Sequence, residues 1–366
     1  MTSTTQAPLA IDGGEPVRSE PFPNRPLPPP AGEADPVAAL EAEFAAYLDL
    51  DAAEAIACRD GAAAYALALE ALGITEGEAV IPALASTAVE AARLAGLTIV
   101  PAEVEADSVN LGPCGLARAL GDRTRVVIAN HAFGHPFSAA ELGRVLEPAG
   151  VPLIEDASAA LGGAYRLQPA GLLGTLALFA FAAPHLLPGE GAVLVTTDAA
   201  FASHLRDARD RAAASIAQDA AQAAIGALRT ADEELTTRRQ LAWELTFDLR
   251  GRKGLSGMAH SRWVMHGYDR YVVRLRSLLW KRPIEDSVAA LQAEGIPCAA
   301  ALRPSLHLDT EIRAALGDDE RLADDGFPVA RRLPEELIAL PLHGGMTDLD
   351  IADITVALRK LEAAST

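Results

Sequence analysis

Short apolar strands alternate with helical segments between residues 80 and 155. Strands are predicted at 80–82, 98–103, 125–130 and 152–155, and helices at 86–94, 115–120 and 139–148. Strands separated by helices at this spacing predict a mostly parallel sheet with helices on both faces. Ligands of such sheets bind beside the carboxyl ends of the strands. We therefore expect one crevice, formed by the loops at Asp60, Ala83, His131, Asp156 and Pro184.

The rest of the chain divides into an arm, the remainder of this α/β unit and a smaller unit. Residues 1–36 are rich in proline and glycine and predict an extended arm. Helices are predicted at 37–48, at 62–72 after an Asp60 N-cap, and over most of 201–249. A strand at 271–276 and helices at 285–294 and 348–361 follow. The predicted domains are the arm (1–36), a large α/β domain (37–249) and a small C-terminal α+β domain (250–366).

Composition excludes several classes of partner. The formal charge of −19 over 366 residues predicts a surface that repels phosphate backbones, so no nucleic-acid partner is expected. No apolar run reaches the roughly 20 residues that a membrane span needs, and no signal peptide is recognisable at the N-terminus. The three cysteines are far apart, and no histidine spacing is typical of a metal site. A cytoplasmic protein without a metal is expected.

Five motifs, in this order, resemble a known family. The opening LAIDGGEPVRSEPFP resembles the aminocyclitol and aminohydroxybenzoate branches of the family. Next, ALEALGITEGEAVIPALAST is similar to the family's ALGIGPGDEVIVPAFTF, and NHAFGHPF to its VHLYGQPAD. Further on, PLIEDASAALGGAY is similar to VIEDAAQAHGATY, and GIPCAAALRPSLHL to the C-terminal GI…YPPLH. The chain thus resembles the DegT/DnrJ/EryC1/StrS aminotransferases. The resemblance implies the fold type I of pyridoxal phosphate (PLP) enzymes, with a seven-stranded, mostly parallel sheet flanked by helices. It also implies a homodimer with the active site at the interface.

The family's cofactor contacts are only partly present. The aspartate that binds the pyridine nitrogen corresponds to Asp156, but the lysine that forms the Schiff base corresponds to His185. The phosphate-binding serine corresponds to Ala180, and the family's Ser-Gly-Thr to Asp60-Gly61-Ala62. The stacking aromatic is missing from 84–88, and the partner subunit's asparagine from 226–229. Hydrogen bonds to charged groups contribute about 1.5–3 kcal/mol each, so weak or absent binding of PLP and of pyridoxamine phosphate (PMP) is predicted.

The same crevice contains residues suited to acid–base chemistry. His131, Asp156, His185 and Glu190 are the predicted catalytic residues, because histidines beside carboxylates transfer protons near neutral pH. The predicted substrate-binding residues are Asp60, Ser86, His135, Ser158, Arg229 and His307. Structural alternatives stay open: His131 and His135 as strand-end residues, Glu190 as a loop-shaping residue, His307 in a surface loop, and Arg238 on a solvated helix face.

Three functions fit these residues. The first is a cofactor-independent enzyme of natural-product or amino-sugar biosynthesis that catalyses dehydration or cyclisation. The second is a non-catalytic partner of an active paralogous aminotransferase. The third is a PMP-dependent sugar dehydratase with His185 as its base, because one branch of the family carries histidine at the lysine position. The arm and the segment 201–249 are expected at a subunit interface, with Arg229 reaching the neighbouring crevice.

Overall fold

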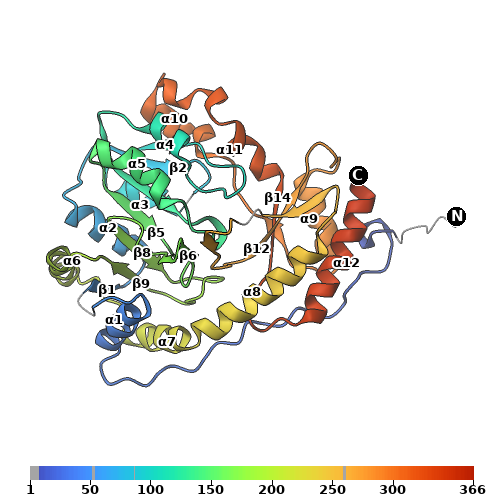
Figure 1. Cartoon of the computed structure of the whole chain (residues 1–366), viewed down its shortest axis with the longest axis horizontal. Helices are drawn as coiled ribbons and strands as arrows, with labels where there is room; N and C mark the ends of the chain where they lie inside the picture. The colour runs from blue at the N-terminus through green and yellow to red at the C-terminus, as the bar shows by residue number, and fades with distance from the viewer. Residues whose placement is uncertain (1–7, 52–53, 86, 259–260) are drawn as a thin grey trace.

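A seven-stranded sheet forms the centre of the larger part of the molecule (Figure 1). The computed structural model describes residues 8–51, 54–85, 87–258 and 261–366. The strand order is β1-β9-β8-β5-β4-β2-β3, and only β9 runs antiparallel to the others. The strands are β1 (Ala55–Cys58), β2 (Glu78–Pro82), β3 (Thr98–Ala102), β4 (Thr124–Asn130), β5 (Leu153–Asp156), β8 (Leu176–Ala180) and β9 (Ala192–Val195). The predicted mostly parallel sheet is confirmed.

Helices cover both faces of this sheet because alternate strand residues point to opposite sides. In β2, Ile81 packs with α2 and α3, whereas Val80 packs with α4 and α5 on the other face. Beside them, α6 covers the first face, and α1 and α7 cover the β1–β9–β8 edge of the second. The helices are α1 (Pro36–Tyr47), α2 (Gly61–Ala71), α3 (Val89–Leu94), α4 (Pro113–Ala119), α5 (Ala139–Ala149), α6 (Ala199–Arg211) and α7 (Gln218–Arg229).

The segment 201–249 is divided into three helices, α6, α7 and α8 (Ala231–Asp248). The first break has a tertiary cause. The Arg59 amide donates to the Ala214 carbonyl at 2.7 Å, and Ser215 forms a β-bridge with Cys58. Ala213 adopts a φ of +48° to make this turn. Pairing with the end of β1 therefore overrides the helical preference of an alanine-rich segment.

A second core lies around a four-stranded antiparallel sheet, at right in Figure 1. Its strands are β10 (Leu255–Gly257), β12 (Tyr271–Leu275), β13 (Ala299–Ala300) and β14 (Leu337–Leu340), covered by α9 (Ile284–Ala293) and α12 (Asp348–Ser365). Leu241 and Leu245 of α8 also pack in this core, so α8 connects the two parts. A third, three-stranded sheet consists of β6 (Ala164–Tyr165), β7 (Gln168–Pro169) and β11 (Val264–Met265). Helix α10 (Thr310–Leu316) packs near β3, and α11 (Pro328–Arg332) follows it in the chain.

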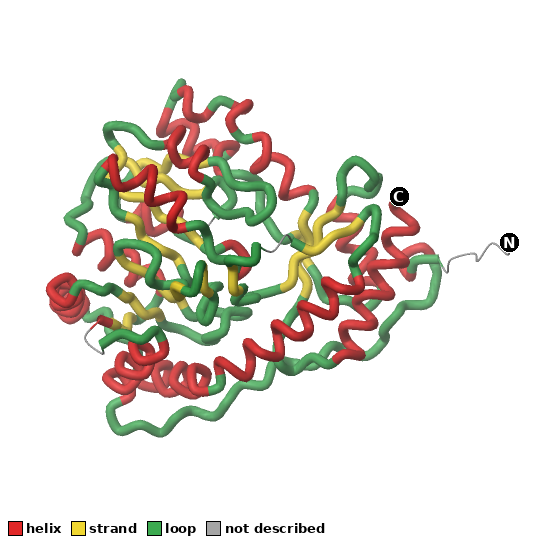
Figure 2. Tube along the Cα trace, viewed as in Figure 1, coloured by secondary structure: helices red, strands yellow, loops and turns green. Residues whose placement is uncertain are grey.

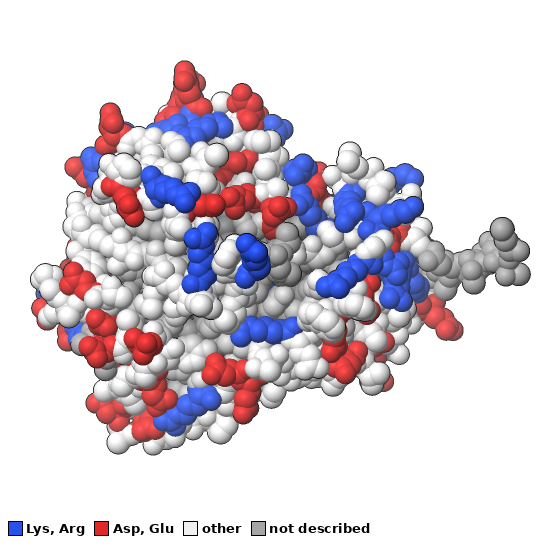
Figure 3. Space-filling view, in the orientation of Figure 1, with Lys and Arg blue, Asp and Glu red and all other residues white. Residues whose placement is uncertain are grey.

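No described helix is both long and apolar enough to cross a membrane. On the face shown in Figure 3, acidic and basic side chains are interspersed. That face therefore presents no continuous basic field of the kind that binds a nucleic-acid backbone.

The N-terminal arm packs against the rest of the same chain, beside α12 and α8, and then leads into α1 (Figure 2). Arg18 donates to Asp350 at 2.7 Å and to Asp353 at 2.9 Å on α12. Further along, the Ala31 amide donates to the Gln222 carbonyl of α7 at 3.2 Å. The arm is therefore part of the folded chain at both ends of its course.

Two glycines outside the arm, Gly226 in α7 and Gly345 before α12, leave room for the backbone of the arm to approach. A Cβ atom on Gly226 would lie 2.3 Å from the Pro29 carbonyl oxygen, and one on Gly345 would lie 2.5 Å from that of Asn24. By contrast, a Cβ on the helical Gly143 would make only an ordinary contact of 3.5 Å. The arm and the body are thus fitted to each other at backbone level.

We expect opposite effects from two alanine substitutions in helices. Gly143→Ala should raise the free energy of unfolding by about 0.5–1 kcal/mol, because alanine restricts the unfolded backbone. Gly226→Ala should lower it by about 1–3 kcal/mol, because the new methyl group displaces the arm. Urea unfolding followed by circular dichroism measures both. Equal stabilisation by the two substitutions would show that the arm does not seat on α7.

Candidate active site

A cavity of about 180 Å³ lies beside the carboxyl ends of β4 and β5, where the sequence places the crevice. Four predicted site residues line it: His131, Asp156, Ser158 and His185. The others are Leu84, Ala85, Thr87, Val109, Asn130, Ala132, Phe133, Ala159, Asp269, Arg270, Ala301 and Leu302. The predicted Ser86 lies outside the described residues. The loops after β2, β3, β4, β5 and β8 thus meet two segments of the smaller part of the chain, one before β12 and one after β13.

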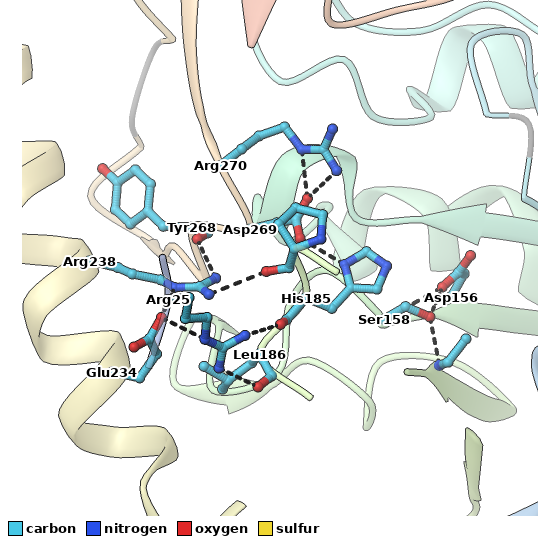
Figure 4. Close-up of polar contacts among 12 residues, drawn as sticks. Arg25, Asp156, Ser158, His185, Leu186, Glu234, Arg238, Tyr268, Asp269 and Arg270 are labelled. Atoms are coloured by element: carbon cyan, nitrogen blue, oxygen red, sulfur yellow. Dashed lines mark hydrogen bonds and ion pairs between the residues drawn. The ribbon is translucent and has the colours of Figure 1, made fainter. Parts of the chain in front are cut away.

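His185 is held by a buried carboxylate. Its Nδ1 lies 2.7 Å from Oδ1 of Asp269, whose side chain is 2% exposed, and Arg270 donates to the other oxygen at 2.7 Å (Figure 4). Figure 4 shows the second ring nitrogen, Nε2, on the side of Asp156 and Ser158. No hydrogen bond joins Nε2 to another described residue. Asp269 therefore fixes the ring and leaves Nε2 available to a ligand.

Asp269 is ionised in this arrangement. Burial alone raises the pKa of a carboxyl group, but the hydrogen bonds and charges of His185 and Arg270 outweigh it, so the pKa of Asp269 lies below its ordinary value. The turn after β4 positions it: the Asp269 amide donates to the Phe133 carbonyl at 3.2 Å. Gly134 permits this approach, since a Cβ there would lie 2.7 Å from the Tyr268 nitrogen. Gly134 therefore contributes to this site by letting the segment that carries Asp269 approach the turn after β4.

Asp156 already receives four hydrogen bonds from its own chain. The hydroxyls of Tyr65 and Thr87 donate to Oδ2 at 2.9 and 2.8 Å, and Ser158 donates to Oδ1 from its hydroxyl at 2.6 Å and its amide at 3.2 Å. Ser158 Oγ also accepts from the Ala180 amide at 2.8 Å. The sequence suggested an arginine or a backbone amide as partner; the structure gives mainly hydroxyls. Both oxygens of Asp156 are thereby occupied.

The N-terminus of α2 is capped by a carboxylate. The predicted N-cap is confirmed, since Asp60 accepts from the Ala63 amide at 2.7 Å. Burial raises the pKa of Asp60, but the hydrogen bonds from the Ala63 amide and Arg59 and the charge of Arg59 together outweigh it, so the pKa lies below its ordinary value. A negative charge thus occupies the helix end that attracts anions. Asp60 is not among the residues that line the cavity, so its role as a substrate contact stays a prediction.

Small residues stand close together where the resemblance places the family's phosphate-binding hydroxyls. A Cβ on Gly61 would lie 3.0 Å from the Ala180 methyl group, and Ala62 follows Gly61 in the first turn of α2. Neither Ala62 nor Ala180 has a hydroxyl to donate. The chain's three lysines are Lys253, Lys281 and Lys360, and none of them is among the described residues that line the cavity.

His131 is part of the cavity lining, but its side chain is fully buried and both ring nitrogens are bonded to other residues. Its side chain has no exposed surface, Nε2 lies 2.7 Å from Glu155, and Nδ1 accepts from the Phe137 amide at 3.0 Å. The ring stacks on Phe137 with centroids 4.3 Å apart. Because Nδ1 accepts from an amide, we assign the proton to Nε2. Both nitrogens are engaged, so the geometry gives His131 a structural role and not the predicted catalytic one.

Four further predicted residues do not line this cavity, and their roles stay predictions. Glu190 is exposed between two glycines of the loop, and Arg229 is an exposed residue paired with Glu33 and Glu43. His135 is buried and lines two other cavities, and its backbone oxygen accepts from the Asn110 side chain at 2.7 Å. His307 is buried, not in a surface loop. None of the four lines the cavity around His185.

His307 gives the stability of the fold a pH dependence. Its Nδ1 lies 2.7 Å from Ser305 Oγ, its ring stacks on Phe327, and Nε2 has no hydrogen-bond partner among the described residues. Burial lowers the pKa of His307 to about 4. The folded state thus binds fewer protons than the unfolded state between pH 6.5 and 4, so stability is lost as the pH falls through this range.

We expect this loss to reach at most about 3 kcal/mol from His307 alone. Urea unfolding of the wild type and of His307→Gln at pH 7 and pH 4.5 isolates it, because all other groups titrate in both proteins. The wild type should lose more stability between the two pH values than the variant. The exposed His204→Gln serves as control and should behave like the wild type. Identical pH dependence in wild type and His307→Gln would contradict the assignment.

The fold is that of the fold type I PLP transferases. A solved structure of DesI with its TDP-sugar product superimposes with a TM-score of 0.84 at 25% identity, covering 96% of this chain and 95% of that one. An L-glutamine:2-deoxy-scyllo-inosose aminotransferase of Streptomyces fradiae is 30% identical and aligns over 97% of both chains. An L-glutamine:scyllo-inosose aminotransferase of Streptomyces griseus is 30% identical over 82% of this chain and 80% of its own.

The DegT/DnrJ/EryC1/StrS aminotransferase family model matches residues 33–359, which is most of the chain. The chain therefore belongs to the DegT/DnrJ/EryC1/StrS aminotransferase family.

Proposed function

We propose that this family member has lost PLP-dependent transamination and catalyses proton transfer without a cofactor. Its substrate would be a small sugar- or cyclitol-derived molecule of natural-product biosynthesis. The observation that carries the proposal is the His185–Asp269 pair, whose free Nε2 faces a cavity in which Asp156 is already fully hydrogen-bonded.

The described residues do not fit PLP or PMP. A protonated pyridine nitrogen would have to displace Thr87 or Tyr65 from Asp156. A phosphate group would meet the Asp60 carboxylate at the end of α2, and hydroxyls are absent at Ala62 and Ala180. Each missing hydrogen bond to a charged group weakens binding by about 1.5–3 kcal/mol. His185 cannot form a Schiff base, since its side chain has no primary amine. No step of the proposed reaction therefore uses the cofactor.

The pair of His185 and Asp269 supplies a general base. The Asp269 carboxylate accepts from Nδ1–H, which leaves the lone pair on Nε2 directed away from it. Nε2 then removes a proton from a carbon next to a carbonyl group, and the electron pair of the C–H bond forms an enolate. When a hydroxyl group lies on the neighbouring carbon, the enolate expels it. The proton on Nε2 passes to the departing oxygen, so the net reaction is loss of one water.

The substrate class follows from the relatives and from the cavity. The relatives from Streptomyces fradiae and Streptomyces griseus are named for cyclitol ketones, and DesI was solved with a TDP-sugar product. A cavity of about 180 Å³ has room for on the order of six water molecules, which suits one polyhydroxylated ring. Ser158, Thr87 and Arg270 offer hydroxyl and guanidinium groups to such a ring. We therefore propose a ketone-bearing sugar or cyclitol ring as the reacting part.

Deuterium exchange tests this function without knowledge of the natural substrate. The purified protein is incubated with scyllo-inosose in D₂O, without added cofactor, and the signals of the protons next to the carbonyl are followed by NMR. Loss of these signals faster than in the buffer control supports the proposal. Exchange that begins only after PMP is added would instead support a PMP-dependent dehydratase with His185 as its base. Absence of exchange with and without PMP, for scyllo-inosose and for a nucleotide-linked ketosugar, would favour a non-catalytic partner.

The assembly is also a proposal. We infer a homodimer with the crevice at its interface, as the family resemblance implies, with a heteromer of this chain and a paralogous aminotransferase as the alternative. Light scattering of the purified chain should give twice the monomer mass. A monomer that dimerises only when a paralogous aminotransferase is added would support the heteromer.

A further inference from the structure

Three consecutive carbonyl groups of the catalytic loop are bound by two arginines. Arg25 donates from Nη1 to the His185 carbonyl at 2.6 Å and from Nη2 to the Leu186 carbonyl at 2.7 Å. Arg238 donates to the Pro184 carbonyl at 3.2 Å and to that of Tyr268 at 3.1 Å (Figure 4). The loop is thereby held from one side by two planar guanidinium groups, while His185 contacts Asp269.

A single carboxylate joins the two arginines. Glu234 on α8 accepts from Arg238 at 2.7 Å, and Nε of Arg25 lies 3.2 Å from the same oxygen. Arg238 has the largest fully buried side chain among the described residues, and Arg25 is largely buried. Burial, and then the charge of Arg238, lower the pKa of Arg25. Burying two cations beside one anion lowers the stability of the fold, because the charges lose their hydration. The arrangement therefore indicates a function that needs several fixed hydrogen-bond donors at once.

The two arginines come from very different parts of the chain. Arg238 lies on α8, whereas Arg25 lies on the N-terminal arm, 160 residues from His185. The arm is seated just beside Arg25, because a Cβ on Gly345 would lie 2.5 Å from the Asn24 carbonyl oxygen. Tyr268, whose carbonyl Arg238 binds, directly precedes Asp269. The same network therefore touches both members of the His185–Asp269 pair through their backbones.

We propose that Arg25 is a positioning residue through which the N-terminal arm sets the geometry of the catalytic loop. The inference rests on the proposed function of His185. Without the Arg25 donors, the carbonyls of His185 and Leu186 lose their partners, and the loop is free to turn His185 away from Asp269. A displacement of about 1 Å at a catalytic group can lower a rate by about a hundredfold. The chemistry in the crevice thus depends on the arm being in place.

The hydrogen bond between His185 and Asp269 provides a test that needs no substrate. In protein labelled with ¹⁵N-histidine, its Nδ1 proton should give a downfield signal, assigned by its loss in His185→Asn. Arg25→Met keeps the apolar stem of the side chain but removes its donors, and we expect this signal to broaden or disappear. We expect the deuterium exchange rate to fall about 10–100-fold. Arg25→Lys, with one donor group in place of a two-pronged fork, should restore only part of both.

Arg18→Ala is the matched control, because Arg18 fastens the same arm to α12, away from the loop. It should leave the signal unchanged. An unchanged signal in Arg25→Met, or equal loss in Arg18→Ala, would overturn the assignment to Arg25. If Arg25→Met does not fold, Arg25→Lys alone decides, since full retention of the signal would contradict the need for two donors. Signal loss in Arg25→Met together with no exchange in the wild type would refute the proposed function but not the positioning.

Discussion

His185→Ala is expected to lower the rate of deuterium exchange by about 10²–10⁴-fold, the usual contribution of a general base. Asp269→Asn should also lower it strongly, because the amide removes the negative charge opposite Nδ1 and can stabilise the wrong tautomer of the ring. Exchange is measured at equal protein concentration by NMR, and thermal unfolding of each variant confirms that it is folded.

Glu190→Gln is the matched control for this prediction. Glu190 lies on the same loop and was a predicted acid, but it is exposed and does not line the cavity. We expect its substitution to leave the exchange rate unchanged. A His185→Ala variant with full activity, or a Glu190→Gln variant with as large a loss, would show that a different group moves the proton.

Arg238→Ala is expected to lower the free energy of unfolding by about 3–5 kcal/mol. The sequence suggested a solvated helix face for Arg238, but its side chain is 1% exposed. Its removal leaves a cavity, takes the closest cation from Glu234, and leaves the carbonyls of Pro184 and Tyr268 without a donor. Breaking a buried ion pair by removing one partner has effects of this size.

Urea unfolding measures the effect, and Arg229→Ala provides the comparison. Arg229 pairs with two carboxylates, Glu33 and Glu43, but all three side chains are partly exposed. Exposed ion pairs contribute little to stability, so the unfolding midpoint of Arg229→Ala should be close to that of the wild type. Similar midpoints for Arg238→Ala and Arg229→Ala would contradict the buried network.

The fold could be predicted from the sequence because local patterns and tertiary structure agree there. The strands and helices between residues 78 and 156 follow the alternation of apolar runs and turns, and the Asp60 N-cap follows from its place before an alanine-rich helix. The prediction failed where long-range pairing decided the backbone. The break after α6 depends on Cys58 and Arg59, and nothing in the local sequence of 212–217 shows it.

The site was predicted only in part, for a similar reason. His185, Asp156 and Ser158 could be found because they align with motifs of the family. Asp269, Arg25 and Arg238 could not, because their roles arise when the segment before β12, the arm and α8 meet at one loop. One signal was available: Asp269 stands between Tyr268 and Arg270 just before a strand, and a lone carboxylate there is a candidate partner for a histidine.

Tyr65 could not be identified from the sequence either, and it bears most directly on the cofactor. It lies inside the apolar sequence of α2, where its hydroxyl is hidden among alanines and leucines. In the structure this hydroxyl binds Asp156. Burial, followed by the neighbouring Asp156 charge, raises the pKa of Tyr65 well above its usual value, so it stays a neutral donor. The periodicity of a sequence predicts which face of a helix is buried, but not which polar group on that face forms a hydrogen bond.

An absorbance spectrum between 300 and 500 nm tests the central claim most directly. The purified protein is measured alone, after addition of PLP and after addition of PMP, with unbound cofactor removed by gel filtration each time, and with a transaminating member of the family as positive control. We expect a featureless spectrum for this chain under all three conditions. A retained band near 330 nm or above 390 nm would mean that the crevice still binds the cofactor, and would contradict chemistry by His185 without one.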